Sequence, residues 1–285
     1  AATHSYSTPG TYTITISGQI EGFAFLDGGD KLKLRDISQW GSLKLGNTGG
    51  YFQGASNFTS TATDAPDLTS TTNFENFFQF ATSFNANINA WNVSGVTNMN
   101  STFEGAHNFN QPLSSWNVSN VTQMRAMFRE AFAFNQDLSA WNVSKVWHFG
   151  IMFENAGSFN QNLGSWDIAS GGISANHETW LDGMLGGTAQ SLDNYGLTLI
   201  GWSQLANINS MYVNGAGKHA PNEFNTSAGY YDDADVLTAR AALIANGWII
   251  YDSGETVRPA PPVPMQRVGE TRTVTTTYHN GSGAA

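Results

Sequence analysis

A motif of 25 residues recurs without insertion through the middle of the chain and limits what the chain can fold into. Its clearest copies read FNANINAWNVSGVTNMNSTF, FNQPLSSWNVSNVTQMRAMF and FNQDLSAWNVSKVWHFGIMF. A fixed period in this range is the signature of a protein built from stacked, equivalent units. Equivalent residues keep the same step, among them Trp91, Trp116, Trp141 and Trp166, and also Phe84, Phe109, Phe134 and Phe159.

One unit contains two different hydrophobic patterns. From Leu113 to Val118 the apolar residues follow the short alternation that is typical of a β-strand. From Met124 to Ala131 they recur at i, i+3, i+4 and i+7, as on one face of a short helix. Such a small unit cannot bury its apolar face alone, but units stacked strand on strand at about 4.8 Å can. The sequence therefore predicts an α/β solenoid, a stack of these units made of short parallel strands and short helices.

Stacking would place equivalent polar residues in columns. The column at the loop contains Asn110, Asn135 and Asn160, and an amide ladder of this kind satisfies backbone groups. The other column faces outward from the expected strands and is a candidate binding surface. It contains Asn92, Asn117, Asn142 and Asp167. The first three also begin Asn-Val-Ser triplets that fit the glycosylation sequon, although the repeat itself explains these triplets.

The repeat deviates most informatively in KVWHFGIMF, residues 145–153. Trp147 and His148 replace the Thr and Gln of the preceding unit and lie next to Lys145. These positions are expected to be exposed, and an exposed aromatic residue beside polar groups marks a contact site. Lys145, Trp147 and His148 therefore join the candidate binding surface. The alternative is that Trp147 packs over a neighbouring turn.

Composition limits the classes of partner. Only 12% of the residues are charged, and the net charge is −10 with 12 Lys and Arg. Phosphate binding requires clustered cations, so neither nucleic acid nor an anionic membrane surface is expected as a partner. No apolar run approaches the ~18 residues of a membrane span, so no membrane insertion is expected. Abundant Asn, Thr, Ser and Trp with few Lys favour an extracellular or surface-exposed location.

The sequence contains no recognisable catalytic set, and we expect neither an enzyme nor a cofactor. There is no Cys, and none of the six His residues has a zinc-type spacing. Two loops rich in carboxylates are weak candidates for Ca²⁺, because this ion prefers oxygen ligands. They contain Asp27 and Asp30 in the first loop, and Asp232, Asp233 and Asp235 in the second. The alternative role for these residues is in turns and helix caps.

Four segments are expected along the chain. They are a β-rich N-terminal part at 1–35, the repeats at 36–178, a C-terminal cap at 179–254, and a Pro-rich linker with a Thr-rich tail at 255–285. Within the first segment, residues 11–16 alternate like a half-buried strand. In the cap we expect helices near 180–185, 195–205 and 236–245, the last one capped by Asp235, and a strand at 248–251.

The pattern SFNQ-x-L-x-x-WNVS-x-VT-x-M-x-x-MF-x-x-A resembles the BspA-like leucine-rich-repeat surface proteins. The stretch THSYSTPGTYTITISG at 3–18 looks like the last strands of a PKD-type β-sandwich, which precedes such arrays. The resemblance implies a curved leucine-rich-repeat-like solenoid on the outside of a cell or particle. Proteins of this family are typically adhesive, known relatives bind host matrix proteins, and the family has no shared catalytic residues to transfer.

Two functions remain open from the sequence. In the first, the chain is an extracellular adhesion or interaction module that binds a protein or glycan on another surface through its repeat face. In the second, it is a structural subunit or decoration protein of a surface assembly, such as a cell-surface layer, a filament or a virion exterior. Residues 255–285 would then dock on neighbouring subunits.

Overall fold

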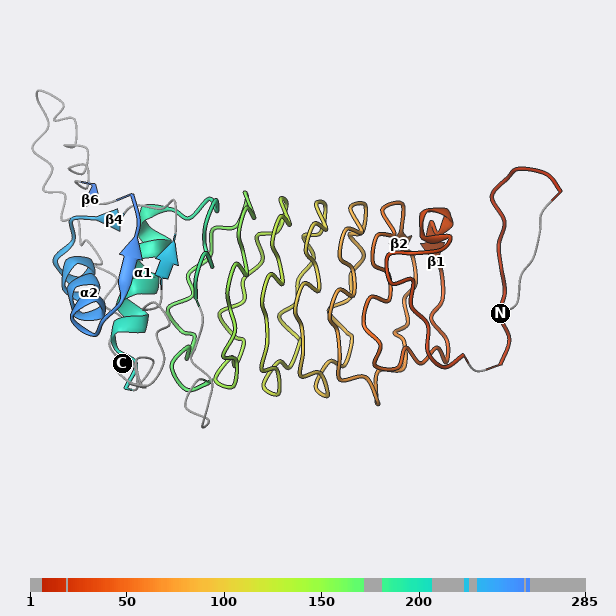
Figure 1. Cartoon of the computed structure of the whole chain (residues 1–285), viewed down its shortest axis with the longest axis horizontal. Helices are drawn as coiled ribbons and strands as arrows, with labels where there is room; N and C mark the ends of the chain where they lie inside the picture. Colours follow the sequence, from red (N-terminus) through yellow and green to blue (C-terminus); the bar gives the residue numbers. More distant parts are fainter. Residues whose placement is uncertain are drawn as a thin grey trace, which may run out of the picture.

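The computed structural model describes residues 7–18, 20–171, 181–206, 223–225, 230–253 and 255–256. From about residue 20 to 171 the chain winds into coils that lie side by side along the long axis of the molecule (Figure 1). The regular elements are the 3-10 helix η1 (Lys31–Lys33), β1 (Asp36–Ile37), β2 (Thr59–Ser60), α1 (Leu192–Ser203), β3 (Glu223–Asn225), β4 (Tyr230–Tyr231), α2 (Ala234–Ala245), β5 (Ile249–Tyr251) and β6 (Glu255–Thr256).

The strands pair in parallel and only two at a time, as β1–β2, β3–β5 and β4–β6. Between residues 61 and 170, neighbouring coils are joined by isolated parallel bridges instead. One line of these bridges connects Asn73 to Asn98, Asn98 to Gln123, and Gln123 to His148. Each bridge joins residues 25 positions apart, so the period of the sequence is also the length of one coil.

The expected α/β solenoid is wrong. Between residues 61 and 170 the structure has neither a helix nor a strand. The two α-helices of the described residues both lie beyond the repeats, and the strands are two or three residues long. The coils are built from tight turns, and single bridges stand where continuous strand ladders were expected.

Left-handed backbone explains why no helix forms over residues 124–131. Ala126 and Glu130 have φ angles of 54° and 57°, and two such residues break a right-handed helix. Amide groups that a helix would use internally donate to the next coil instead, for example Phe128 N to Met152 O at 2.8 Å. The apolar residues keep a helix-like spacing because each tight turn joins residues three positions apart, as Met127 N to Met124 O and Ala131 N to Phe128 O.

The strand expected over residues 113–118 is absent for a related reason. Trp116 N donates to Leu113 O at 3.0 Å, and Val121 N donates to Val118 O at 2.9 Å. These bonds close turns within one coil, so the backbone groups are not free to form a ladder. Trp116 and Val118 are nevertheless buried, because the turns direct them into the core.

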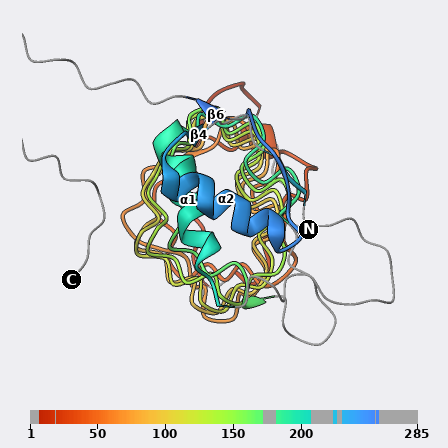
Figure 2. The same ribbon diagram turned by 90° about the vertical axis from the view of Figure 1, so that its left-hand side faces the viewer.

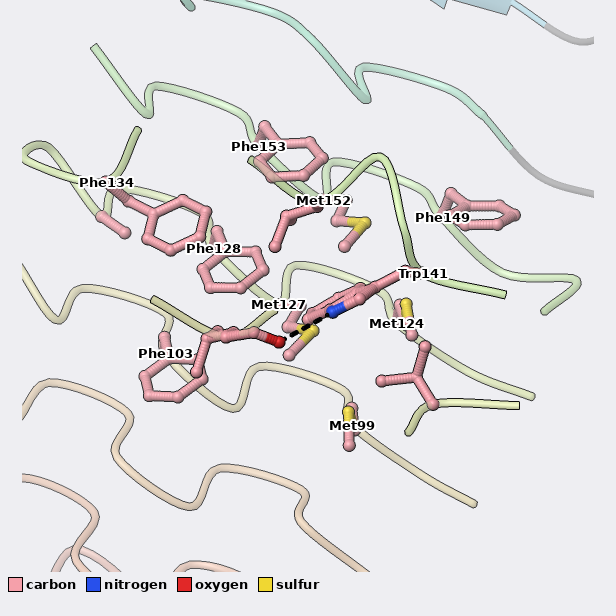
Figure 3. Packing of buried hydrophobic residues seen from close by; sticks show 14 of the residues in the cluster. Met99, Phe103, Met124, Met127, Phe128, Phe134, Trp141, Phe149, Met152 and Phe153 are labelled. Atoms are coloured by element: carbon pink, nitrogen blue, oxygen red, sulfur yellow. Dashed lines mark hydrogen bonds between the residues drawn. The ribbon is translucent and has the colours of Figure 1, made fainter. Parts of the chain in front are cut away.

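Aromatic rings form a continuous core through the coils (Figure 3). The rings of Phe103, Phe128 and Phe153 are stacked 5.4 and 5.5 Å apart, with interplanar angles of 4° and 5°. Within one coil, Phe128 also stacks on Phe134 with a centroid distance of 3.9 Å. All four side chains are fully buried. Buried aromatic side chains dominate core energetics, so these rows hold the coils together.

Two hydrogen-bonded ladders fix one coil against the next. In the first, Trp141 donates its indole N–H to Leu113 O at 3.1 Å, and Trp116 and Trp166 make equivalent bonds (Figure 3). In the second, Asn135 N donates to Asn110 Oδ1 at 2.9 Å, and Asn160 N donates to Asn135 Oδ1 at 2.8 Å. The expected structural role of the loop asparagines is therefore confirmed.

Helices α1 and α2 contact each other and lie across the C-terminal end of the coils (Figure 2). Ser191 caps α1 by accepting a hydrogen bond from Asn194 N at 3.2 Å. The expected helices at 195–205 and 236–245 are confirmed within a few residues. The N-cap of α2 is Asp233, however, so the expected cap at Asp235 is wrong.

The remaining expectations for the two ends have different outcomes. The strand at 248–251 is present as β5, whereas the described residues of the expected helix at 180–185 form turns. Residues 11–16 form no strand, and residues 7–18 extend away from the coils, where no strand of the described residues pairs with them (Figure 1). The linker and tail at 257–285 lie outside the described residues.

Candidate functional site

The outward polar column caps its own turns. Asn142 Oδ1 accepts hydrogen bonds from Ser144 N at 3.1 Å and from Ser144 Oγ at 2.7 Å. Asn92, Asn117 and Asp167 accept equivalent bonds from the backbone two residues further along. The three asparagines are exposed and Asp167 is half-buried. The side-chain oxygens of this column thus have a structural role, and binding by the column stays a prediction.

Trp147 and His148 form a stacked pair. Their ring centroids are 5.3 Å apart with an interplanar angle of 16°, and both residues are half-buried, whereas the sequence predicted exposed positions. The backbone fixes the pair on the preceding coil, because Trp147 N donates to Thr122 O at 3.0 Å. Lys145 lies on the same coil and donates through Nζ to Asn120 Oδ1 at 2.8 Å. We call Lys145, Trp147 and His148 the contact cluster.

Charged residues from neighbouring coils surround His148. Burial lowers the pKa of His148, the positive charge of Arg125 lowers it further, and the negative charge of Asp182 opposes the shift. The imidazole is therefore neutral at pH 7, when it can both donate and accept a hydrogen bond.

The approach of Asp182 depends on a glycine. A Cβ atom added to Gly150 would lie 3.0 Å from Asp182 Oδ1 and 3.3 Å from His148 Nε2. The two side chains therefore share the space that Gly150 leaves open. Sequence reasoning missed both Asp182 and Gly150, although a Gly in the place of Arg125 was a visible signal.

A line of polar side chains that sequence reasoning missed crosses five coils. Arg129 donates to Glu154 Oε2 at 2.7 Å and to Glu104 Oε1 at 2.9 Å. Glu104 also accepts from Gln79 at 2.7 Å, and Gln79 accepts from Gln53 at 2.6 Å. Hydrogen bonds to Glu154 and then Glu104 raise the pKa of Arg129. The signal in the sequence was the near-constant spacing of these residues.

The calcium candidates are engaged in other roles. Asp27 forms an ion pair with Lys31, and Asp30 forms one with Lys33 at 2.9 Å. In the second loop, Asp233 is the N-cap residue of α2 and Asp235 lies in its first turn, where the helix dipole favours a negative charge. Asp232 precedes them and is half-buried.

The structure reveals no metal centre in the part of the chain that it describes. No group of three or more His, Cys, Asp or Glu side chains that could hold a metal ion occurs among these residues. No helix within the described ranges is long and apolar enough to cross a membrane.

These features define a repeat protein made of turn-built coils with a two-helix cap. The chain belongs to the family described as "Mycoplasma protein of unknown function, DUF285", which matches residues 23–116 and again 72–178, together more than half of the chain. The matches overlap because equivalent coils can be aligned in more than one register. Neither the curated proteins nor the solved structures give a match.

Proposed function

We propose that the protein is a non-enzymatic, extracellular interaction module that binds a protein or glycan on another surface. The observation that carries the proposal is the contact cluster. A stacked and partly exposed Trp147–His148 pair lies at the point where the repeat deviates, and the charges of Arg125 and Asp182 act on its imidazole. Aromatic residues with a polar rim are typical of the residues that dominate binding.

The coils support this function by their rigidity. The backbone of the coil that carries His148 is hydrogen-bonded on both sides, by Met124 N to His148 O at 2.9 Å on one side and by Ile151 N to Asp182 O at 2.8 Å on the other. A preorganised surface loses little conformational entropy on binding. The resemblance of the repeat to BspA-like surface proteins, which are typically adhesive, points in the same direction.

One observation favours the second function, a subunit or decoration protein of a surface assembly. Tyr12, Ile14 and Ile16 are 44%, 69% and 64% exposed in the segment that extends away from the coils. A β-prone segment with exposed apolar side chains is suited to pair with a strand of another subunit. Residues 255–285 would provide the other docking segment in such an assembly.

The experiment compares Trp147→Ala with Thr122→Ala, the equivalent position one coil earlier. Immobilised wild-type protein is screened against arrays of host-surface proteins and glycans, and the affinities of both variants are measured for the ligands it retains. We expect a loss of at least about tenfold for Trp147→Ala and less than twofold for Thr122→Ala. Equal binding by the wild type and Trp147→Ala would remove the contact cluster from the function.

A further inference from the structure

Two exposed phenylalanines flank one turn in the middle of the coils. Among the described residues between 33 and 171, Phe80 and Phe132 are the exposed large hydrophobic side chains, at 43% and 46%. The first coil exposes Leu26 and Leu32 as well, at 60% and 53%, but neither of these is aromatic. Single exposed apolar residues are ordinary on protein surfaces, but these two lie against the same turn.

Both rings rest on the same turn. Phe80 comes from the coil before this turn and lies directly over Gly105, where an added Cβ would be only 2.8 Å from Phe80 Cε1. Phe132 comes from the coil after it and stacks on His107, with a centroid distance of 4.5 Å and an angle of 23°. His107 N donates to Gly105 O at 3.0 Å, so the two supports belong to one turn. We call Phe80, His107 and Phe132 the aromatic patch.

The backbone at Phe80 is strained. Its φ angle is 57°, in the left-handed region that bulky residues avoid. The equivalent positions of neighbouring coils hold Gly54 and Gly105, which adopt this conformation without cost. Further along, Glu130 and Asn155 occupy the same column with φ angles of 57° and 59°, so the conformation belongs to every coil. What is particular to Phe80 is an exposed aromatic ring that takes no part in the core.

The patch offers two ring faces that are supported from behind. Phe80 is backed by the main chain of Gly105, and Phe132 is backed by the imidazole of His107. The next coil presents Gly157 in the column of Phe132, and a Cβ added there would meet nothing within 4 Å. No other side chain of the described residues therefore fills the space where a Gly157 side chain would stand.

Partly exposed polar groups come from the same coils as the two rings. Gln79 precedes Phe80 and Glu130 lies two residues before Phe132, and both are half-buried. Gln79 belongs to the polar line that continues through the buried Glu104 to Arg129, and Arg129 pairs with Glu130 at 3.1 Å. Ring faces with polar groups beside them match a sugar ring, whose C–H face is apolar and whose edge carries hydroxyl groups.

We propose that the aromatic patch binds pyranose rings of an uncharged polysaccharide. The net charge of −10 disfavours polyanionic glycans. This site is separate from the contact cluster and adds a ligand class to the proposed function.

The test measures retention of the purified chain on cellulose, chitin and mannan. The variants are Phe80→Gly, Phe132→Ala and the double variant, and the control is Leu197→Ala, which removes a 45% exposed side chain from α1. We expect wild type and Leu197→Ala to bind at least one polysaccharide equally, and each patch variant to bind about tenfold more weakly. Phe80→Gly should unfold at the same temperature as wild type or higher, since it relieves the left-handed strain.

Three results would overturn the proposal: no retention of the wild type by any of the polysaccharides, equal retention of the double variant, or loss of binding only together with loss of the fold. Trp147→Ala separates the two sites. If Trp147→Ala abolishes binding on an array while the double variant binds normally, the contact cluster stands and the aromatic patch falls. If the double variant abolishes binding while Trp147→Ala binds normally, the aromatic patch stands and the contact cluster falls.

Discussion

Trp202 of helix α1 donates its indole N–H to the main-chain carbonyl of Leu163 at 3.0 Å. Trp166, in the last coil, makes the same bond to Leu138 at 2.9 Å. The helix thus continues the row of tryptophans although its backbone is unlike that of a coil. The cap is therefore attached to the last coil by the same indole-to-carbonyl hydrogen bond that attaches each coil to the previous one. A helix can end the row of coils because it supplies a tryptophan at the required place.

Replacing Trp202 with Phe should therefore weaken the docking of the cap. The ring is kept, but the buried carbonyl of Leu163 loses its donor, which typically costs about 1–3 kcal/mol of unfolding free energy. Denaturant unfolding followed by far-UV circular dichroism measures the change. Trp116→Phe, in the middle of the coils, is the matched variant and should cost a similar amount. An unchanged midpoint for Trp202→Phe would show that the bond does not hold the cap.

The two asparagine columns should respond differently to alanine. Asn135 Oδ1 accepts from Asn160 N and from Gln161 Nε2 of the next coil, both at 2.8 Å. Asn117 Oδ1 accepts from Ser119 N within its own exposed turn, at 3.1 Å. We expect Asn135→Ala to lower the unfolding free energy by about 1–2 kcal/mol, and Asn117→Ala by less than about 0.5 kcal/mol. Chemical denaturation of both variants measures the two losses of unfolding free energy. Equal losses would contradict a greater structural role for the loop column than for the outward column.

The sequence was sufficient to identify the buried columns but insufficient to identify the backbone that presents them. Burial repeats at fixed positions because side-chain hydrophobicity determines it, as for Trp141 and Phe128. The conformation between these positions depends on left-handed residues such as Ala126 and Ile151. Neither residue type favours that conformation, so no local signal announced it. It is imposed by hydrogen bonds from neighbouring coils.

The candidate site was predictable to a similar extent. The deviation of the repeat identified Trp147 and His148 directly. The proximity of Asp182 was not predictable, because the last coil is longer than the others. Ile151 N donates to Asp182 O at 2.8 Å, whereas the equivalent Ala126 N donates to Gly150 O at 3.0 Å. The number of positions between the two hydrogen-bonded residues therefore grows from 24 to 31. A repeat of 25 residues in the sequence does not predict which residue lies opposite Ile151 in this longer coil.

Arg129 should be more important to stability than an ordinary surface arginine. It is the cation between Glu104 and Glu154, and Glu104 is only 8% exposed. Arg129→Met would leave a buried carboxylate without its cation, and we expect a loss of about 2–4 kcal/mol of unfolding free energy. Thermal and chemical denaturation measure it.

A second substitution tests the cause of that loss. Adding Glu104→Gln to Arg129→Met removes the buried charge and should recover part of the stability. Strict additivity of the two substitutions would mean that the residues do not interact. Lys33→Met is the comparison for an exposed pair, because Lys33 and its partner Asp30 are 77% and 74% exposed, and it should change little.

The folded protein should lose stability on mild acidification through His148. Burial first, and the charge of Arg125 second, lower the pKa of this side chain, while Asp182 opposes them. Between the lowered pKa and the usual value of about 6.5, the unfolded chain binds a proton that the folded chain does not, so stability rises with pH. The contribution of His148 is therefore fully present above pH ~6.5 and is lost progressively as the pH falls toward the folded pKa.

The measurement is the unfolding free energy of wild type and His148→Gln between pH 7.5 and 5, together with an NMR titration of the imidazole. His148→Gln should show a smaller decrease below pH ~6.5, because Gln does not titrate. Two further variants separate the causes: Arg125→Gln should raise the pKa of His148, and Asp182→Asn should lower it. A titration midpoint for His148 at or above that of a free histidine would contradict the burial of the imidazole between these charges. It would then leave the Trp147–His148 pair as an open surface feature that protonates freely.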